Sequence, residues 1–278
     1  MLNSSVFPVI HGHRGCRGLY PENTLPAFRH AVTLGVEVLE LDVVISADSQ
    51  VVVSHEPWML SAICRTPAGQ PIAPDEQLQH NLYALSYPEI RRYDCGSTRH
   101  PAFPAQQSVP AYKPLLREVI QDVDRLSLAL GRPLVRFSVE LKSEPAGEGH
   151  FQPPPRQFLD LVVRELQALQ VLARTTLLCF DKRILQLAHQ LLPGMAVCLL
   201  VEDKQPHADH LQELGFVPTV YGPNFPLVSS ELVTDLNELG IQLVPWTVNE
   251  YPDFHRLLAF HPAGITTDYP DRFLLASH

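Results

Sequence analysis

The stretch from His11 to Trp58 concentrates side chains that can move protons and bind cations. His13 ends one apolar run and His55 ends a later one, and histidine can accept or donate a proton near neutral pH. Glu40 and Asp42 lie two residues apart in another apolar run, so on a β-strand their carboxylates would share one face. These residues predict acid and base chemistry beside a bound divalent cation.

Further side chains extend this set. Glu140 lies in a separate apolar run and would complete a three-carboxylate site for Ca²⁺ or Mg²⁺, which both prefer oxygen ligands. Arg14 offers a planar donor fork for phosphate oxygens, and Lys142 could add positive charge there. Glu22 could favour a helix N-terminus or contact a substrate, and Trp246 could contact a substrate or fill the interior. The alternative interpretation is that the charged residues only form salt bridges or are hydrated.

Helical and strand patterns alternate eight times, which is typical of an α/β fold of the TIM (β/α)8 barrel type. The expected strands cover residues 8–14, 36–46, 134–142, 175–180, 196–201, 219–221, 241–248 and 264–267. The expected helices cover residues 24–34, 115–126, 156–172, 182–192, 208–214, 229–239 and 253–260, with a short helix from residue 271. Barrel enzymes keep their active sites at the carboxyl ends of the strands, where most of the selected residues fall.

Residues 59–114 interrupt the alternation with a long run rich in turn residues. A segment of this length is rarely structureless inside a compact domain. It follows the second strand, on the side where barrels keep their active sites. We therefore expect residues 1–278 to form one domain, with 59–114 as a small insertion over the barrel mouth.

Composition narrows the possible partners. The formal net charge is −9 and no basic tract is present, which makes nucleic acid an improbable partner. No apolar run is long enough to span a membrane and no signal peptide precedes Val9, so we expect a cytoplasmic protein without an integral membrane segment. No nucleotide-binding glycine motif is present. The oligomeric state stays open.

The chain has five cysteines, an odd number, and no two of them have the spacing of zinc ligands. We expect free thiols in a reducing compartment. His11 is interpreted as a structural residue, and Asp268, close to Pro270, as part of a structural turn.

These motifs resemble the glycerophosphodiester phosphodiesterase family. The matching segments are His13-Arg14-Gly15, Pro21-Glu22-Asn23-Thr24, Phe28, Glu40-x-Asp42, Asp48, His55, Val139-Glu140-Leu141-Lys142, Trp246-Thr247-Val248-Asn249 and Gly264-Ile265-Thr266-Thr267-Asp268-Tyr269-Pro270. The resemblance implies that the acidic positions bind the metal and that an insertion follows the second strand. It also implies hydrolysis of glycerophosphodiesters, such as glycerophosphocholine, to sn-glycerol 3-phosphate and an alcohol, with Glu22 close to the site.

Two alternatives stay open at this point. One is a lysophospholipase D-like phosphodiesterase on the same barrel. The other is a non-catalytic barrel that binds phosphodiesters or lipid head groups. The sequence does not decide which head group is preferred, whether Ca²⁺ or Mg²⁺ binds, or which histidine is the acid and which the base.

Overall fold

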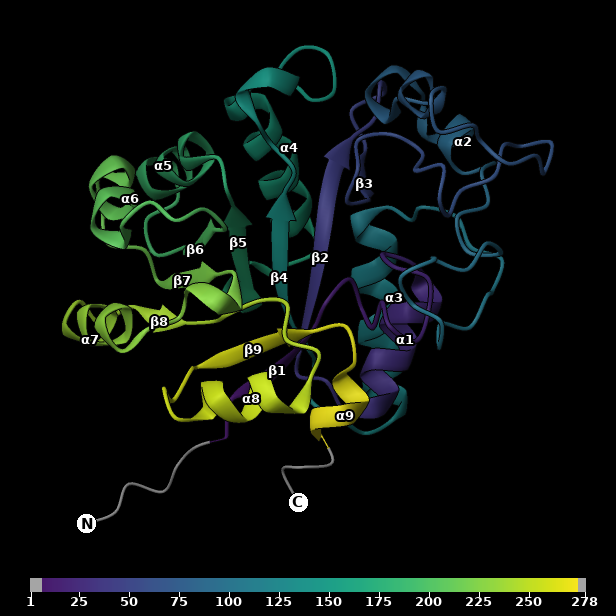
Figure 1. Ribbon diagram of the computed structural model, residues 1–278. Coiled ribbons are helices and arrows are strands. Elements are labelled where there is room, and N and C mark those ends of the chain that lie inside the picture. The colour runs from purple at the N-terminus through teal and green to yellow at the C-terminus, as the bar shows by residue number, and fades with distance from the viewer. Residues whose placement is uncertain (1–6, 275–278) are drawn as a thin grey trace.

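Eight parallel strands form a nearly closed barrel, and the helices that connect them lie around its outside (Figure 1). The computed structural model describes residues 7–274. Its barrel strands are β1 (Val9–Gly12), β2 (Val38–Ile45), β4 (Arg136–Leu141), β5 (Thr175–Cys179), β6 (Ala196–Val201), β7 (Val220–Pro223), β8 (Gln242–Leu243) and β9 (Gly264–Thr267). They pair in the order β8-β7-β6-β5-β4-β2-β1-β9. The N–H groups of Ala263 and Thr266 donate to the carbonyls of Leu243 and Pro245 and join the two ends, which confirms the predicted TIM barrel.

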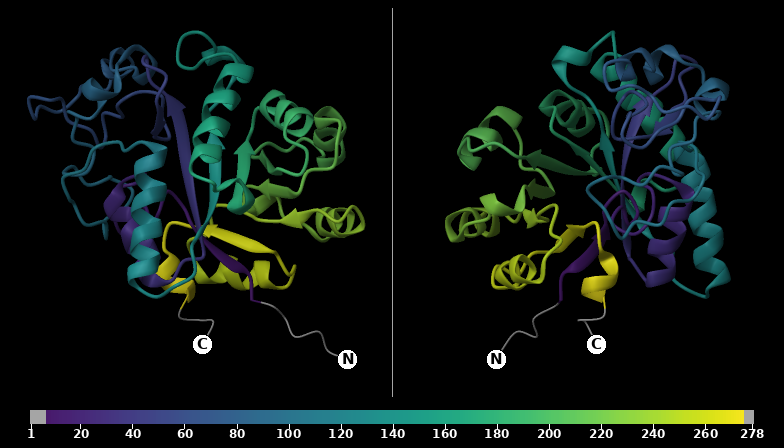
Figure 2. Two further views of the ribbon diagram at one scale, coloured as in Figure 1. Left: turned by 180° about the vertical axis from the view of Figure 1, so that it is seen from behind. Right: turned by 45° about the vertical axis from the view of Figure 1, so that its right-hand side comes forward.

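Helices alternate with these strands, as Figure 2 shows from two further directions. They are α1 (Leu25–Leu34), α3 (Leu116–Ala129), α4 (Pro155–Ala168), α5 (Lys182–Leu191), α6 (His207–Leu214), α7 (Ser230–Glu238), α8 (Tyr251–Leu258) and α9 (Pro270–Leu274). Local signals set their ends. Asp181 accepts a hydrogen bond from the Arg183 N–H at the start of α5, and Ser229 accepts one from the Leu232 N–H at the start of α7. Gly35 ends α1 with a left-handed φ of 100°.

Several expected elements are shorter than predicted, and two of them have a clear local reason. The strand expected at 241–248 contains only the two residues of β8, because Pro245 has no N–H to donate to the neighbouring strand. The helix expected at 156–172 ends at Ala168, and Gln170 has a φ of 59°, which lies outside the helical region.

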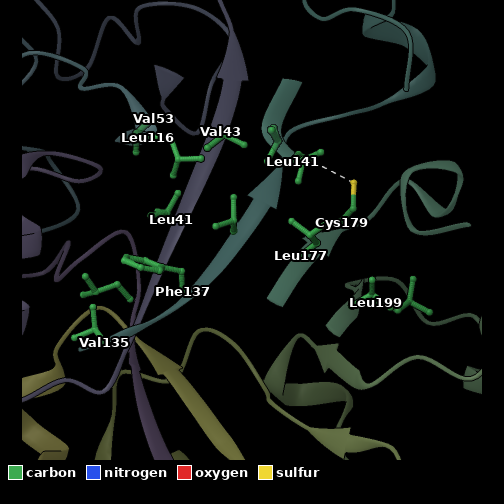
Figure 3. Close-up of a cluster of buried hydrophobic side chains, with 14 of the residues drawn as sticks. Leu41, Val43, Val53, Leu116, Val135, Phe137, Leu141, Leu177, Cys179 and Leu199 are labelled. Atoms are coloured by element: carbon green, nitrogen blue, oxygen red, sulfur yellow. Dashed lines mark hydrogen bonds between the residues drawn. The ribbon is translucent and has the colours of Figure 1, made fainter. Parts of the chain in front are cut away.

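The main hydrophobic core lies between the outer face of the sheet and the helices (Figure 3). Leu41 and Leu177 point to this outer face and have no exposed surface. In contrast, Ser138 on β4 and Leu178 on β5 face the inside of the barrel and remain 5% and 8% exposed. They do so because they border a cavity of about 770 Å³ that follows the barrel axis. We call it the axial cavity.

Residues 59–114 form a lobe beside the barrel, with the short elements η1 (Gln77–Gln79), η2 (Leu82–Ala84) and α2 (Tyr87–Ile90). The lobe has its own core, which packs against β2 and against β3 (Val51–Val53), an antiparallel strand beside β2. Met59, Leu82 and Ile90 are completely buried in it. Residues 55–58 line the axial cavity, whereas no described residue of 59–114 does.

A disulfide between Cys64 and Cys95 crosses this lobe. The prediction of free thiols is wrong for this pair, because folding brings two residues 31 positions apart to a Cα–Cα distance of 4.0 Å. Cys16, Cys179 and Cys198 are free and buried, as expected for small apolar side chains. Among residues 7–274, no helix has the length and apolar character needed to cross a membrane.

Candidate active site

Three carboxylates meet at the carboxyl ends of two neighbouring strands. Glu40 and Asp42 come from β2, and the parallel register of β2 and β4 sets Glu140 directly beside Asp42. Each residue offers an oxygen atom within 4.8 Å of the others, and all three are buried. The structure thus brings together the three residues that the sequence selected as metal ligands.

The charges in this cluster are strongly coupled. Burial, together with the charges of Asp42 and Glu140, raises the pKa of Glu40 well above its usual range. Burial also raises the pKa of Glu140, although Lys142 opposes the shift with an Nζ atom 2.6 Å from the Glu140 Oε1 atom. Burial raises the pKa of Asp42, but the Arg14 guanidinium outweighs it and holds this carboxyl below its usual range. Buried carboxylates that repel one another form a donor set that suits a hard divalent cation such as Ca²⁺ or Mg²⁺.

His13 lies at the end of β1 with its ring held by Asp268. The His13 Nδ1 atom is 2.7 Å from the Asp268 Oδ1 atom, and its Nε2 atom is 3.8 Å from the Glu40 Oε2 atom. Burial lowers the pKa of His13 to about 4, although Asp268 opposes this shift. The ring is therefore neutral near pH 7 and directs Nε2 toward the carboxylate cluster.

The interpretation of Asp268 as part of a structural turn misses its role at the site. Its carboxylate accepts hydrogen bonds from two Arg17 nitrogens at 2.9 and 3.1 Å and from the Asn249 side chain at 2.8 Å, besides its contact with His13. Burial raises the pKa of Asp268, but its interactions with His13 and Arg17 outweigh burial and lower the pKa below its usual range. The available signal was its place at the carboxyl end of the last barrel strand.

His55 lines the cavity in the segment that follows β3. Its Nδ1 atom is 2.7 Å from the Glu56 Oε1 atom, which leaves Nε2 to face a substrate. Burial raises the pKa of Glu56, but the hydrogen bond with His55 and the charges of His55 and Arg14 outweigh it and bring the pKa to about 2. Each of the two histidines therefore has a carboxylate partner, and the sequence did not single out Glu56.

Lys113, at the end of the lobe, is linked to the His55–Glu56 pair through the side chain of Ser54. Its buried ammonium donates to the Ser54 hydroxyl at 2.7 Å, and that hydroxyl donates to the Glu56 carbonyl at 2.6 Å. Burial lowers the pKa of Lys113, while the charge of Glu56 opposes the shift. Spacing in the sequence gave no sign of this contact.

Arg14 and Glu22 form a pair at the edge of the site. The Arg14 Nη1 atom donates to the Glu22 Oε1 atom at 2.9 Å, and its backbone N–H donates to the Glu40 Oε2 atom at 2.8 Å. Arg14 has a positive φ of 49°, a turn conformation that places the N–H on that carboxylate. Arg14 lines the axial cavity and Glu22 does not, so Glu22 holds Arg14 in place. The salt-bridge interpretation and a phosphate-binding role are therefore compatible.

Much of the opposite wall of the cavity is apolar. Seven cavity-lining side chains of β5, β6 and β7 and of the residues that follow β5 and β8 form one cluster, which we call the apolar wall: Leu178, Phe180, Cys198, Leu200, Val220, Val244 and Trp246. The Trp246 indole donates to the Gly222 carbonyl at 2.7 Å, and its ring meets Phe180 edge to face at 5.6 Å. Trp246 is thereby fixed with a surface toward the cavity.

Comparisons with known proteins agree with this geometry. A family model described as the glycerophosphoryl diester phosphodiesterase family matches residues 13–272. A glycerophosphodiester phosphodiesterase of Bacillus subtilis (strain 168) is 27% identical over 94% of this chain and 83% of its own length. A lysophospholipase D of Rattus norvegicus is 28% identical over 94% of this chain and 83% of its own.

Solved structures share the fold. A protein of Silicibacter pomeroyi DSS-3 with the same family description superimposes with a TM-score of 0.86 at 28% identity, over 97% of this chain and 94% of that one. A phosphodiesterase of Oleispira antarctica, solved with the product sn-glycerol-3-phosphate, has a TM-score of 0.75 at 20% identity over 97% and 96% of the two chains.

Proposed function

Because the chain belongs to the glycerophosphoryl diester phosphodiesterase family, we propose that two histidines and a divalent cation carry its reaction. The chain is a phosphoric diester hydrolase that acts on glycerophosphodiesters. Its proposed products are sn-glycerol 3-phosphate and the free alcohol of the head group. One observation carries the proposal: three buried carboxylates lie together, and two of them, Glu40 and Glu140, line a cavity with two histidines, each of which has a carboxylate partner. The non-catalytic alternative has no such support.

Glu40, Asp42 and Glu140 would hold the cation, either Ca²⁺ or Mg²⁺. A divalent cation bound there would polarise an oxygen of the substrate and offset negative charge on the phosphate. These residues suit a cation because they are buried oxygen donors that lie close together. Burial raises the pKa values of Glu40 and Glu140, so a positive partner would stabilise their ionised forms.

We assign the base role to His13 and the acid role to His55. His13 is neutral near pH 7, and its Nε2 atom faces Glu40, where a hydroxyl or water beside the cation would lose its proton. The His55 Nδ1 atom lies 2.7 Å from the Glu56 Oε1 atom, a contact that orients the ring in the cavity to donate a proton to the leaving alkoxide. Arg14 and Lys142 would bind phosphoryl oxygens as charge develops on them.

The lobe of residues 59–114 would act on the site indirectly. We propose that it belongs to the single barrel domain and shapes the leaving-group side of the pocket through residues 55–58, which it holds in place. Shortening it should leave cation binding intact and reduce selectivity among head groups more than hydrolysis of an activated aryl phosphodiester. Unchanged head-group preference in a stable shortened variant would contradict this role.

A second candidate substrate class is favoured by the apolar wall. The rat relative is named a lysophospholipase D, and a lysophospholipid carries one alkyl chain beside the same phosphodiester. An apolar surface within the cavity offers that chain a binding place.

The disulfide provides information about the cellular compartment of the enzyme. Disulfides persist mainly in oxidising compartments, so the Cys64–Cys95 pair favours such a compartment over the cytoplasmic location expected from the sequence. Thiol titration of the denatured protein, isolated from its native source without added reductant, distinguishes three free cysteines from five.

The decisive experiment measures glycerol 3-phosphate released from a panel of glycerophosphodiesters, with and without a chelator. We expect turnover to vanish on exhaustive chelation and to return with Ca²⁺ or Mg²⁺. Glu40→Gln and Asp42→Asn should weaken cation binding, whereas Glu37→Gln, an exposed carboxylate away from the cluster, should not. Full turnover after chelation would rule out the metal-dependent mechanism.

A further inference from the structure

Asp268 contacts Arg17 as well as His13. The Arg17 Nε and Nη2 atoms donate to the two oxygens of the Asp268 carboxylate at 2.9 and 3.1 Å, a two-point contact that fixes the plane of this carboxylate. Its Oδ1 atom therefore contacts both Arg17 and the His13 Nδ1 atom, which lies at 2.7 Å. Because Asp268 has no exposed surface, water cannot take the place of Arg17 there. The direction of the His13 ring thus depends on the position of Arg17.

The lobe of residues 59–114 holds Arg17 by its side chain and by its backbone. The centroid of the Phe103 ring lies 4.7 Å from the Arg17 Cζ atom, an arrangement that favours cation–π attraction. The Gln106 side-chain amide donates to the carbonyls of Arg17 and Tyr20 at 2.7 and 3.2 Å. Phe103 and Gln106 are 7% and 2% exposed, so both contacts are shielded from water.

Gln106 gives this contact a definite geometry. Its amide nitrogen donates to two carbonyls, and its Oε1 atom accepts from the His100 N–H at 3.1 Å. Next to it, the Gln107 N–H donates to the Leu19 carbonyl at 2.8 Å. A buried amide is costly unless it is hydrogen-bonded, so these bonds define how the lobe lies on the segment between β1 and α1.

We propose that Arg17 is a positioning residue for His13 and that Phe103 and Gln106 of the lobe keep Arg17 in place; this inference rests on the proposed role of His13 in the reaction. Arg17 acts through Asp268. Since Lys113 links the same lobe to the segment of His55, the lobe supports both histidines. The contact with Arg17 belongs to residues 103–106, so a lobe shortened elsewhere keeps it.

Loss of the arginine is the first test. Arg17→Met should lower kcat about thirtyfold with less than about a twofold change in KM, because His13 loses its fixed direction while the metal and phosphate ligands remain. Arg17→Lys should recover part of this loss, since a lysine keeps the charge but not the two-point contact. The exposed Arg92→Met is the control. Arg17 also lines the axial cavity, and a rise in KM with unchanged kcat would assign it to substrate binding and overturn the proposal.

The contribution of the lobe is tested at the two residues that hold Arg17. Phe103→Leu and Gln106→Met should each lower kcat about three- to tenfold with little change in KM. Gln107→Met makes the same substitution at the neighbouring exposed position and should behave as wild type. Unchanged kcat in both folded variants would overturn the role of the lobe. If Arg17→Met does not fold, these two variants and Arg17→Gln still decide the proposal.

A double-mutant cycle distinguishes positioning of His13 from a general structural effect. In the His13→Ala protein, Arg17→Met should lower the remaining turnover of an activated aryl phosphodiester less than about twofold, because the residue that Arg17 positions is absent. Losses that simply multiply would mean that Arg17 acts independently of His13 and would contradict the proposal.

Hydrogen exchange reports the contact without turnover. The Nδ1–H resonance of His13, assigned by its absence from the NMR spectrum of His13→Ala, should exchange at least about tenfold faster in Arg17→Met and faster in Phe103→Leu than in wild type. Faster exchange together with normal turnover of His13→Ala would retain the positioning contact and refute the proposed catalytic role of His13. Unchanged exchange together with an inactive His13→Ala protein would retain the catalytic role and overturn the positioning role of Arg17.

Discussion

The two walls of the axial cavity belong to one barrel, yet they obey different physical constraints. The wall from β1, β2, β4 and β9 carries buried charges, and each of these is held by a partner of opposite charge or by a hydrogen bond, as in the pairs His13–Asp268 and Lys142–Glu140. The apolar wall from β5 to β8 needs no such partners. A buried charge without a partner is costly, so the charged wall tolerates little change, whereas an apolar wall can vary in shape. From this difference we propose that the barrel separates bond breaking, on the charged wall, from substrate selection, on the apolar wall.

The strongest test of this comparison removes the proton-transfer groups of the charged wall. His13→Ala and His55→Ala should each lower kcat at least about a hundredfold, because general acid or base catalysis is lost. Asp268→Asn should have a similar effect through the orientation of His13. Steady-state kinetics and circular dichroism give the measurement, with the exposed His255→Ala as the control. Near-normal turnover in a histidine variant would remove that residue from the mechanism.

A smaller effect on kcat is expected for Lys113, which contacts the charged wall through Ser54 and does not line the cavity. Lys113→Met keeps much of the side-chain volume but removes the hydrogen bond to Ser54, which holds Glu56 in position against His55. We expect kcat to fall about tenfold with little change in KM, since one buried hydrogen bond to a charged group is lost.

Lys113→Arg should recover part of the lost turnover, and the exposed Lys204→Met should behave as wild type. A rise in KM with unchanged kcat would mean that Lys113 acts on substrate binding and does not position His55.

On the apolar wall the expected effect is smaller still and falls on binding. Trp246→Leu removes an aromatic surface from the cavity but no charge. We expect KM for glycerophosphocholine to rise about fivefold, the equivalent of about 1 kcal/mol, with a smaller change in kcat. Tyr251→Leu, an exposed aromatic position, is the control. A loss of kcat as large as that of His13→Ala would contradict the proposal that the apolar wall acts in substrate binding and the charged wall in catalysis.

The smallest effect on catalysis is expected for His11, which comes from β1 and lines the axial cavity. Burial lowers the pKa of His11 to about 3, and Arg136 adds to this shift. The folded His11 stays neutral between about pH 6.5 and 3, while the unfolded chain takes up a proton there, so stability falls as pH decreases through this window.

His11→Gln should therefore lose less stability than wild type between pH 7 and pH 4.5, by on the order of 1–3 kcal/mol, with nearly normal turnover at pH 7. Urea unfolding at the two pH values measures the difference. Equal losses in both proteins would show that His11 is not held neutral by the fold.

Several features of the site follow from local sequence alone. Glu40 and Asp42 share a face because successive side chains alternate along a strand. The alternation of strands and helices predicted the barrel, and the barrel placed Glu140 beside Asp42 through the parallel pairing of β2 with β4. These predictions depend on regularities within an element or on the most common arrangement of such elements.

The contacts that the sequence did not reveal join distant positions. Asp268 meets His13 across 255 positions, and Lys113 meets Ser54 across 59. The disulfide between Cys64 and Cys95 is of the same kind. Nothing in the local spacing of these residues indicates a partner, because their approach depends on how complete elements pack.

By itself, the sequence determined the alternating elements, the residue types of the site and the face on which each carboxylate lies, since covalent geometry sets side-chain directions within a strand or helix. Only the tertiary structure decided which carboxylate holds which histidine, that the lobe lies beside the barrel and that the barrel interior is hollow. Those outcomes depend on the closure of the barrel and on the combined volume of side chains from eight strands. No single segment of the chain contains that information.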